Sequence, residues 1–108
     1  MHRLVAVAMV DHIAPGKALS TVIAGETIAV FNVAGRLYAI DDACILCGTS
    51  LAAGLIDGTS VVCANCDWRY DLASGCVHGI PGLRSETFEV AVVDAHVMVD
   101  AMPMPHAG

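Results

Sequence analysis

The chain has 108 residues, 56% of them hydrophobic, and a formal net charge of −6, and this length predicts one domain with one modest core. The longest apolar run, Leu4 to Val10, is far shorter than the ~20 residues of a membrane-spanning helix, so we expect a soluble protein. Five lysines and arginines are too few for the clustered cations that bind nucleic acid, so a positively charged protein partner fits the chain better.

The N-terminal segment does not have the full pattern of an export signal. Met1-His2-Arg3 precedes the apolar run, but Asp11 and His12 follow where a signal peptide continues to a small-residue cleavage site. We therefore expect a cytoplasmic protein. Paired cysteines in a reducing cytoplasm are more often metal ligands than disulfides.

Period-two alternation of apolar residues recurs along the chain, whereas helical periodicity is nearly absent. The clearest hairpins pair 27–33 with 36–40 and 87–93 with 96–99. The second hairpin turns at Asp94-Ala95, where the lack of glycine implies a different turn type or strain. We expect an all-β antiparallel sandwich or partial barrel over residues 1–100 and a flexible tail over 101–108, which contains two prolines.

Four cysteines form two C-x-x-C motifs. Cys44 and Cys47 make the first, Cys63 and Cys66 the second, and the fifteen residues between the motifs match the spacing of a tetrahedral thiolate site. Gly48 can supply the positive φ that the tight turn after the first motif needs. The alternatives are buried free thiols, disulfides and a redox dithiol; the last requires a following helix, which neither motif has.

The residues around both motifs resemble those of Rieske ferredoxins. The segments 41–54 (DDACILCGTSLAAG) and 61–75 (VVCANCDWRYDLASG) align without gaps to the two cluster loops of that family, and a weaker likeness extends from about Val5 to Val99. The resemblance implies a small Rieske-like antiparallel fold whose metal-binding loops span about 41–80. It also implies an electron carrier that is not an enzyme by itself, working between a reductase and a terminal oxygenase.

The chain departs from the family at the metal ligands. Rieske loops read Cys-x-His and Cys-x-x-His and bind a [2Fe–2S] cluster with two thiolates and two imidazoles. Here Leu46 occupies the first histidine position and Cys66 the second, while Cys47 adds a thiolate. Asp67 stands at a position where the family usually has glycine, and aspartate tolerates left-handed backbone better than most residues.

We expect Cys44, Cys47, Cys63 and Cys66 to bind one metal centre. Each C-x-x-C chelate suits a single tetrahedral ion, which favours mononuclear iron or zinc in a rubredoxin-like site. A four-cysteine [2Fe–2S] cluster is the alternative. An iron centre predicts one-electron transfer, whereas redox-silent zinc predicts a structural module that binds a protein partner.

Other residues near the second motif receive weaker interpretations. Cys76 is interpreted as a buried or inert thiol, with a spare or reactive thiol as the alternative. His78 is interpreted as a solvated or hydrogen-bonded loop histidine, with a ligand role as the alternative. Trp68 and Tyr70 share one strand face, and we expect them to pack beneath the loop; the alternative for Tyr70 is a contact between its hydroxyl and a ligand sulfur.

Overall fold

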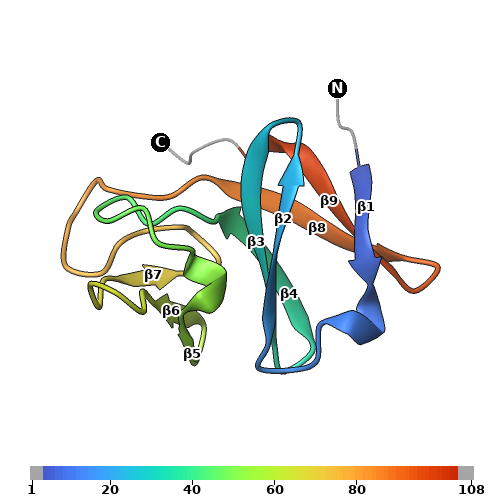
Figure 1. The fold of residues 1–108 in the computed structure, drawn as a ribbon, viewed down its shortest axis with the longest axis horizontal. Helices are drawn as coiled ribbons and strands as arrows, with labels where there is room; N and C mark the ends of the chain where they lie inside the picture. Colours follow the sequence, from blue (N-terminus) through green and yellow to red (C-terminus); the bar gives the residue numbers. More distant parts are fainter. Residues whose placement is uncertain (1–3, 105–108) are drawn as a thin grey trace.

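The computed structural model describes residues 4–104 (Figure 1). The elements follow in the order β1 (Leu4–Met9), η1 (Val10–His12), β2 (Ala18–Ile23), β3 (Glu26–Val33), β4 (Arg36–Asp41), η2 (Leu51–Ala53), β5 (Leu55–Asp57), β6 (Ser60–Val62), β7 (Arg69–Asp71), β8 (Thr87–Val93) and β9 (His96–Pro103). Within the described residues the two helical segments are short 3-10 turns, and no helix is long and apolar enough to cross a membrane. The all-β class is confirmed.

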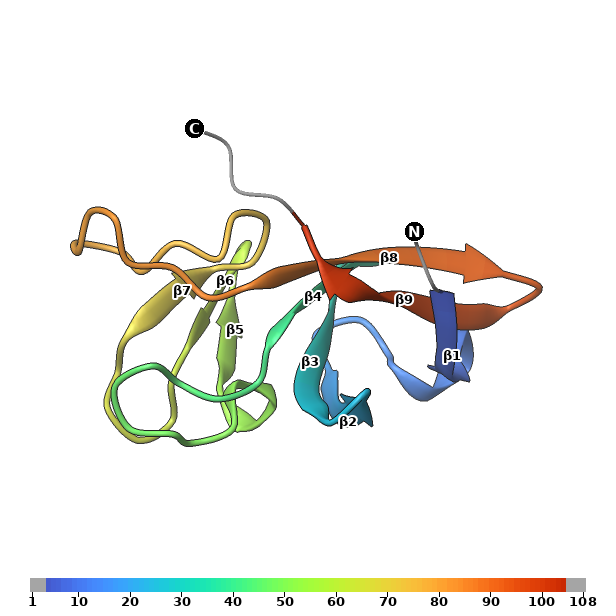
Figure 2. The ribbon, with the colours of Figure 1, turned by 90° about the horizontal axis from the view of Figure 1, so that it is seen from above.

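The strands form two antiparallel sheets. The larger has six strands in the order β1-β9-β8-β4-β3-β2, and the smaller has three in the order β5-β6-β7. Figure 2 shows the smaller sheet and its loops beside one end of the larger sheet. Alternate side chains of the larger sheet face inward and, with Ile13 from the segment after η1, form one buried cluster. Its members are Ile13, Ile23, Ile28, Val30, Ala39, Phe88, Val97 and Val99.

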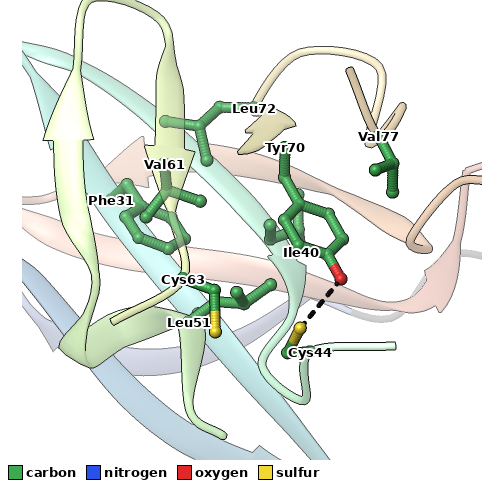
Figure 3. Packing of buried hydrophobic residues seen from close by; sticks show 10 residues of the cluster. Phe31, Ile40, Cys44, Leu51, Val61, Cys63, Tyr70, Leu72 and Val77 are labelled. Carbon is green, nitrogen blue, oxygen red and sulfur yellow. Dashed lines mark hydrogen bonds between the residues drawn. The ribbon is translucent and has the colours of Figure 1, made fainter. Parts of the chain in front are cut away.

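A second buried cluster joins the two sheets. Phe31 of β3 and Ile40 of β4 pack from the larger sheet against residues of the smaller one, including Tyr70 of β7 (Figure 3). Cys44 and Cys63 belong to the same cluster. The core that holds the two sheets together therefore also packs against both cysteine motifs.

Both predicted hairpins are present. β3 and β4 close with Val33 opposite Arg36, and β8 and β9 close with Val93 opposite His96. In the second turn Asp94 and Ala95 have φ values of 50° and 64°, the type I′ conformation that suits twisted strands. Left-handed backbone at a residue with a Cβ costs roughly 1–2 kcal/mol. Of the two alternatives for this turn, strain at Ala95 is therefore the correct one.

The C-terminal strand extends beyond the boundary expected at residue 100. β9 continues to Pro103, which lies opposite Phe88, and the Met104 N–H donates to the Thr87 carbonyl over 2.7 Å. A proline is tolerated there because it ends the strand and needs no ladder donor. The remainder of the predicted tail, 105–108, lies outside the described residues.

Candidate metal centre

The first cysteine motif folds into a tight backbone loop. The Cys44 N–H donates to the Thr49 carbonyl over 3.0 Å, and the Gly48 N–H donates to the Cys44 carbonyl over 2.8 Å. Gly48 has a φ of 76°, as its position in the turn predicted. Ala43 and Ser50, which flank the loop, form an isolated antiparallel bridge.

The second motif repeats this hydrogen-bond pattern position for position. The Cys63 N–H donates to the Trp68 carbonyl over 2.8 Å, and the Asp67 N–H donates to the Cys63 carbonyl over 3.1 Å. Asp67 occupies the place of Gly48 and also has a positive φ, 64°. The expectation that aspartate accepts left-handed backbone at this position is confirmed. We call the two loops the first knuckle (43–50) and the second knuckle (62–69).

The two knuckles bring the four predicted sulfur ligands together. The Sγ atoms of Cys44, Cys47, Cys63 and Cys66 all lie within 4.8 Å of one another. Two of the distances join different knuckles, at 3.6 Å for Cys44 to Cys66 and 3.6 Å for Cys47 to Cys63. These side chains form the one metal-ligating cluster found among residues 4–104, and it includes neither Cys76 nor His78.

Burial differs among the four candidate ligands. Cys44 and Cys63 are buried at 3% and 0% relative exposure, Cys66 is partly exposed, and Cys47 is exposed. The centre would therefore sit with one side in the core and one side at the surface. Cys76 is exposed, which corrects the interpretation of this residue as a buried thiol.

Neighbouring donors and mutual crowding shift the thiol pKa values in opposite directions. The Thr49 side chain and backbone N–H, together with the Asn65 side chain, lower the pKa of Cys47 to about 6. The Trp68 N–H lowers the pKa of Cys66, but burial and the other three cysteines outweigh it and raise that pKa to about 12. A thiol binds a metal as the thiolate, so binding a metal would release protons.

Tyr70 places its hydroxyl against the Cys44 sulfur. The side chain is fully buried, the Ile45 N–H donates to its oxygen over 2.8 Å, and Oη lies 3.2 Å from Cys44 Sγ (Figure 3). When Cys44 is a thiolate its sulfur can only accept, so in that state the Tyr70 hydroxyl donates to it. Burial acts to raise the pKa of Cys44, but hydrogen bonds from Tyr70 and from the Cys47 and Leu46 backbone lower it. Tyr70 thus has both of the roles considered for it, packing and sulfur contact.

Sequence reasoning missed three polar residues at the site. Thr49 and Asn65 each lie within two residues of a ligand cysteine, and both favour the Cys47 thiolate. Asp42 precedes the first knuckle and is buried at 5% relative exposure, with hydrogen bonds to distant segments. Proximity to a ligand was the available signal for Thr49 and Asn65. No local pattern marks Asp42.

Comparison with known proteins agrees with the fold. The family model for the Rieske [2Fe-2S] domain matches residues 3–99. The ferredoxin component of the naphthalene 1,2-dioxygenase system of Pseudomonas putida is 28% identical over 96 residues, which cover 88% of this chain and 91% of that protein. The biphenyl dioxygenase ferredoxin subunit of Pseudomonas sp. (strain KKS102) is 29% identical over 93 residues, covering 84% and 85%.

A solved structure extends this likeness to three dimensions. A chain in the complex of reduced oxygenase and oxidised ferredoxin in carbazole 1,9a-dioxygenase superposes with a TM-score of 0.87 at 24% identity, covering 95% of this chain and 97% of that one. At this identity the likeness shows the fold alone. The paired knuckles on the small sheet, the six-stranded larger sheet and the family match over 3–99 lead to one assignment: the chain belongs to the Rieske [2Fe-2S] domain family.

Proposed function

We propose that the chain is a one-electron carrier in which Cys44, Cys47, Cys63 and Cys66 hold a single iron ion. The sulfur positions carry this proposal. With metal–sulfur bonds of about 2.3 Å, a tetrahedral ion separates its ligand sulfurs by about 3.8 Å. Here two sulfur pairs are 3.6 Å apart and no two sulfurs are more than 4.8 Å apart, so one ion fits among them.

The Rieske cluster of the family does not fit the residues present. That cluster needs an imidazole from each loop, and this chain has Leu46 and Cys66 at those positions. Leu46 has no ligand atom, and its side chain is 55% exposed. An all-cysteine diiron cluster would place two irons and two sulfides between pairs of thiolates, which requires ligand sulfurs on different irons to lie farther apart than they do here.

The proposed carrier role rests on the environment of the sulfurs and on the relatives. A bound iron ion would supply a one-electron change between the ferric and ferrous states. Tyr70 and the N–H groups directed at Cys44 would stabilise the negative charge on the thiolates. The exposed sulfur of Cys47 would bring one edge of the centre to the surface, where a partner can approach.

The partners we propose are a reductase as electron donor and a terminal oxygenase-like enzyme as acceptor. The relatives are ferredoxin components of dioxygenase systems, which are carriers and not catalysts. The net charge of −6 favours encounters with positively charged faces of both partners. Such encounters are fast and salt-sensitive, as transient electron transfer requires.

The test is a visible absorption spectrum of anaerobically purified protein, with iron, zinc and acid-labile sulfide measured on the same sample. A coloured protein with one iron per chain and no sulfide would support the proposal. Two irons with two sulfides would replace it with a four-cysteine cluster. A colourless protein with one zinc after expression in iron-rich medium would refute electron transfer and favour the zinc-bound structural module.

The reduction potential should be nearly independent of pH between about pH 5 and pH 8, the range in which histidine titrates. The reason is that none of the four proposed ligands is an imidazole. Bound thiolates do not take up protons in this range while the metal holds them. Potentiometric titration at several pH values measures the slope, and a steep slope caused by a ligand ionisation would contradict the prediction.

Replacing Tyr70 by phenylalanine should lower the potential, because the hydroxyl proton stabilises the more negative sulfur of the reduced state. A differential stabilisation of about 1 kcal/mol corresponds to about 40 mV, given 59 mV per tenfold change for one electron. Tyr38→Phe is the matched control, because it also removes one tyrosine hydroxyl and the Tyr38 ring lies under the Arg36 guanidinium instead of at the sulfur cluster. Equal shifts in both variants would show that the Tyr70–sulfur contact does not set the potential.

A further inference from the structure

The two knuckles are alike in backbone but differ in what supports them. The second knuckle continues the paired strands β6 and β7, whose register runs from Ser60 opposite Asp71 to Val62 opposite Arg69. The first knuckle is flanked by the isolated bridge between Ala43 and Ser50 and by no strand pair. Its position relative to the second knuckle therefore depends on other contacts.

Tyr70 makes one such contact by reaching from β7 to Cys44 and Ile45. The buried carboxylate of Asp42 makes others, which hold the first knuckle to the larger sheet. Oδ1 accepts from the Ser50 hydroxyl over 2.8 Å and from the Ala52 N–H over 3.0 Å, which closes the loop just beyond the knuckle. Oδ2 accepts from the Ser20 hydroxyl over 3.1 Å, which connects the loop to β2. Hydrogen bonds to an ionised carboxylate are stronger than neutral ones.

The backbone of Asp42 strengthens the same junction. Its N–H donates to the Thr27 carbonyl of β3 over 3.0 Å, and its carbonyl accepts from the Leu51 N–H over 2.7 Å. One residue thus joins the start of the first loop, the end of that loop and two strands of the larger sheet. Cys44 is two residues away, so a displacement of Asp42 would also displace the sulfur of Cys44.

We propose that Asp42 is a positioning residue that anchors the first knuckle to the larger sheet and so controls how long the four cysteines retain their metal. The proposal rests on the proposed metal site. Asp42 takes the place of the strand pairing that the first knuckle lacks. Without its carboxylate, Cys44 and Cys47 would move away from Cys63 and Cys66 together with their loop, and the metal would be released by opening on this side.

The experiment compares Asp42→Ala with Asp42→Asn and with Asp71→Ala. Asparagine keeps the shape, one acceptor oxygen for Ser50 and Ala52, and an amide that can donate to Ser20. Asp71 is the matched control, because its carboxylate also accepts hydrogen bonds from a loop, through the Ser74 N–H and hydroxyl, but outside the first knuckle. Each protein is loaded with one equivalent of Zn²⁺, and metal release to excess chelator is timed.

We expect Asp42→Ala to release zinc about 10 to 100 times faster than the parent protein, the usual effect of losing a residue that orients metal ligands. Asp42→Asn should restore most of the retention, and Asp71→Ala should release zinc at the parent rate. Equal release from Asp42→Ala and the parent would overturn the proposal. If Asp42→Ala does not fold, Ser50→Ala, which removes one of the loop-closing bonds, must show a smaller acceleration, and no acceleration would also overturn it.

A second readout distinguishes positioning from general loss of stability. Cys44 and Cys63 are both buried, so both should resist a thiol-alkylating reagent in the metal-free parent. In metal-free Asp42→Ala, mass spectrometry should find faster alkylation of Cys44 and unchanged protection of Cys63. Equally fast alkylation of Cys44 and Cys63 in this variant would show that Asp42 supports the stability of the whole domain and does not specifically position the first knuckle. If the parent binds no metal at all, the proposed metal centre is wrong. The alkylation rates of Cys44 and Cys63 in the metal-free proteins still test whether Asp42 positions the first knuckle.

Discussion

Replacing Cys63 by serine is expected to abolish stoichiometric metal binding and to lower the stability of the protein by several kcal/mol. Cys63 is fully buried in the core that joins the two sheets, and its sulfur lies 3.6 Å from that of Cys47. A serine hydroxyl does not ionise at neutral pH and is a poor ligand for a metal that prefers thiolates. Binding at structural four-ligand zinc sites contributes on the order of 10 kcal/mol to folding, so loss of the site affects the whole domain.

Cys76→Ser is the matched control for this variant. Cys76 follows the second knuckle in the chain, but its thiol is exposed and lies outside the sulfur cluster. The control should keep one metal per chain and the parent melting temperature, measured by metal analysis and thermal unfolding. Metal loss in Cys76→Ser, or full retention in Cys63→Ser, would show that the ligand set is wrong.

The sequence predicted the parts of the fold that local patterns encode. Alternation located the β3–β4 and β8–β9 hairpins, and the spacing of the two motifs identified four cysteines that the structure brings together. The positive φ at Asp67 followed from its place in the turn. Each of these features depends on residues close together in the chain, where steric limits and side-chain periodicity are strong.

Contacts between distant segments could not be predicted in the same way. The Ser20 to Asp42 bond spans 22 positions and the Tyr70 contact with Cys44 spans 26. Neither partner in such a pair restricts the other locally, so the sequence alone left the Tyr70 alternative open and gave no role to Asp42. The end of β9 was misplaced for a related reason, because the strand is extended to Pro103 by pairing with Phe88.

These distant contacts explain how a small chain could support the proposed metal centre near its surface. The second knuckle is held by strand pairing, the first by Asp42, and Tyr70 connects them by reaching from β7 to Cys44. A preorganised ligand set reduces the rearrangement that accompanies a change of metal charge. In the proposed carrier, slow metal loss and easy electron transfer would therefore depend on the same rigid support.

Gly75→Ala should destabilise the protein by about 2–5 kcal/mol, the combined cost of overpacking and of left-handed backbone at a residue with a Cβ. Gly75 has a φ of 80°, and an added Cβ would lie 2.2 Å from the Ser85 carbonyl oxygen and 3.1 Å from Thr87 Cγ2. At this point the Ser85 N–H donates to the Gly75 carbonyl over 2.8 Å, so the segment after β7 is joined to the segment before β8. Ser85 cannot move away from the added Cβ without breaking its hydrogen bond to Gly75.

Gly82→Ala separates the two contributions. Gly82 lies in the same connection with a φ of 84°, but its added Cβ would meet nothing within 4 Å, so only the backbone cost of roughly 1–2 kcal/mol remains. Denaturant unfolding of both metal-loaded variants gives the two free energies. Equal losses would contradict the close packing at Gly75. Val77, within this connection, packs in the same core as Cys44 and Cys63. A larger loss of unfolding free energy in Gly75→Ala, together with faster metal release, would therefore show that the connection stabilises the knuckles.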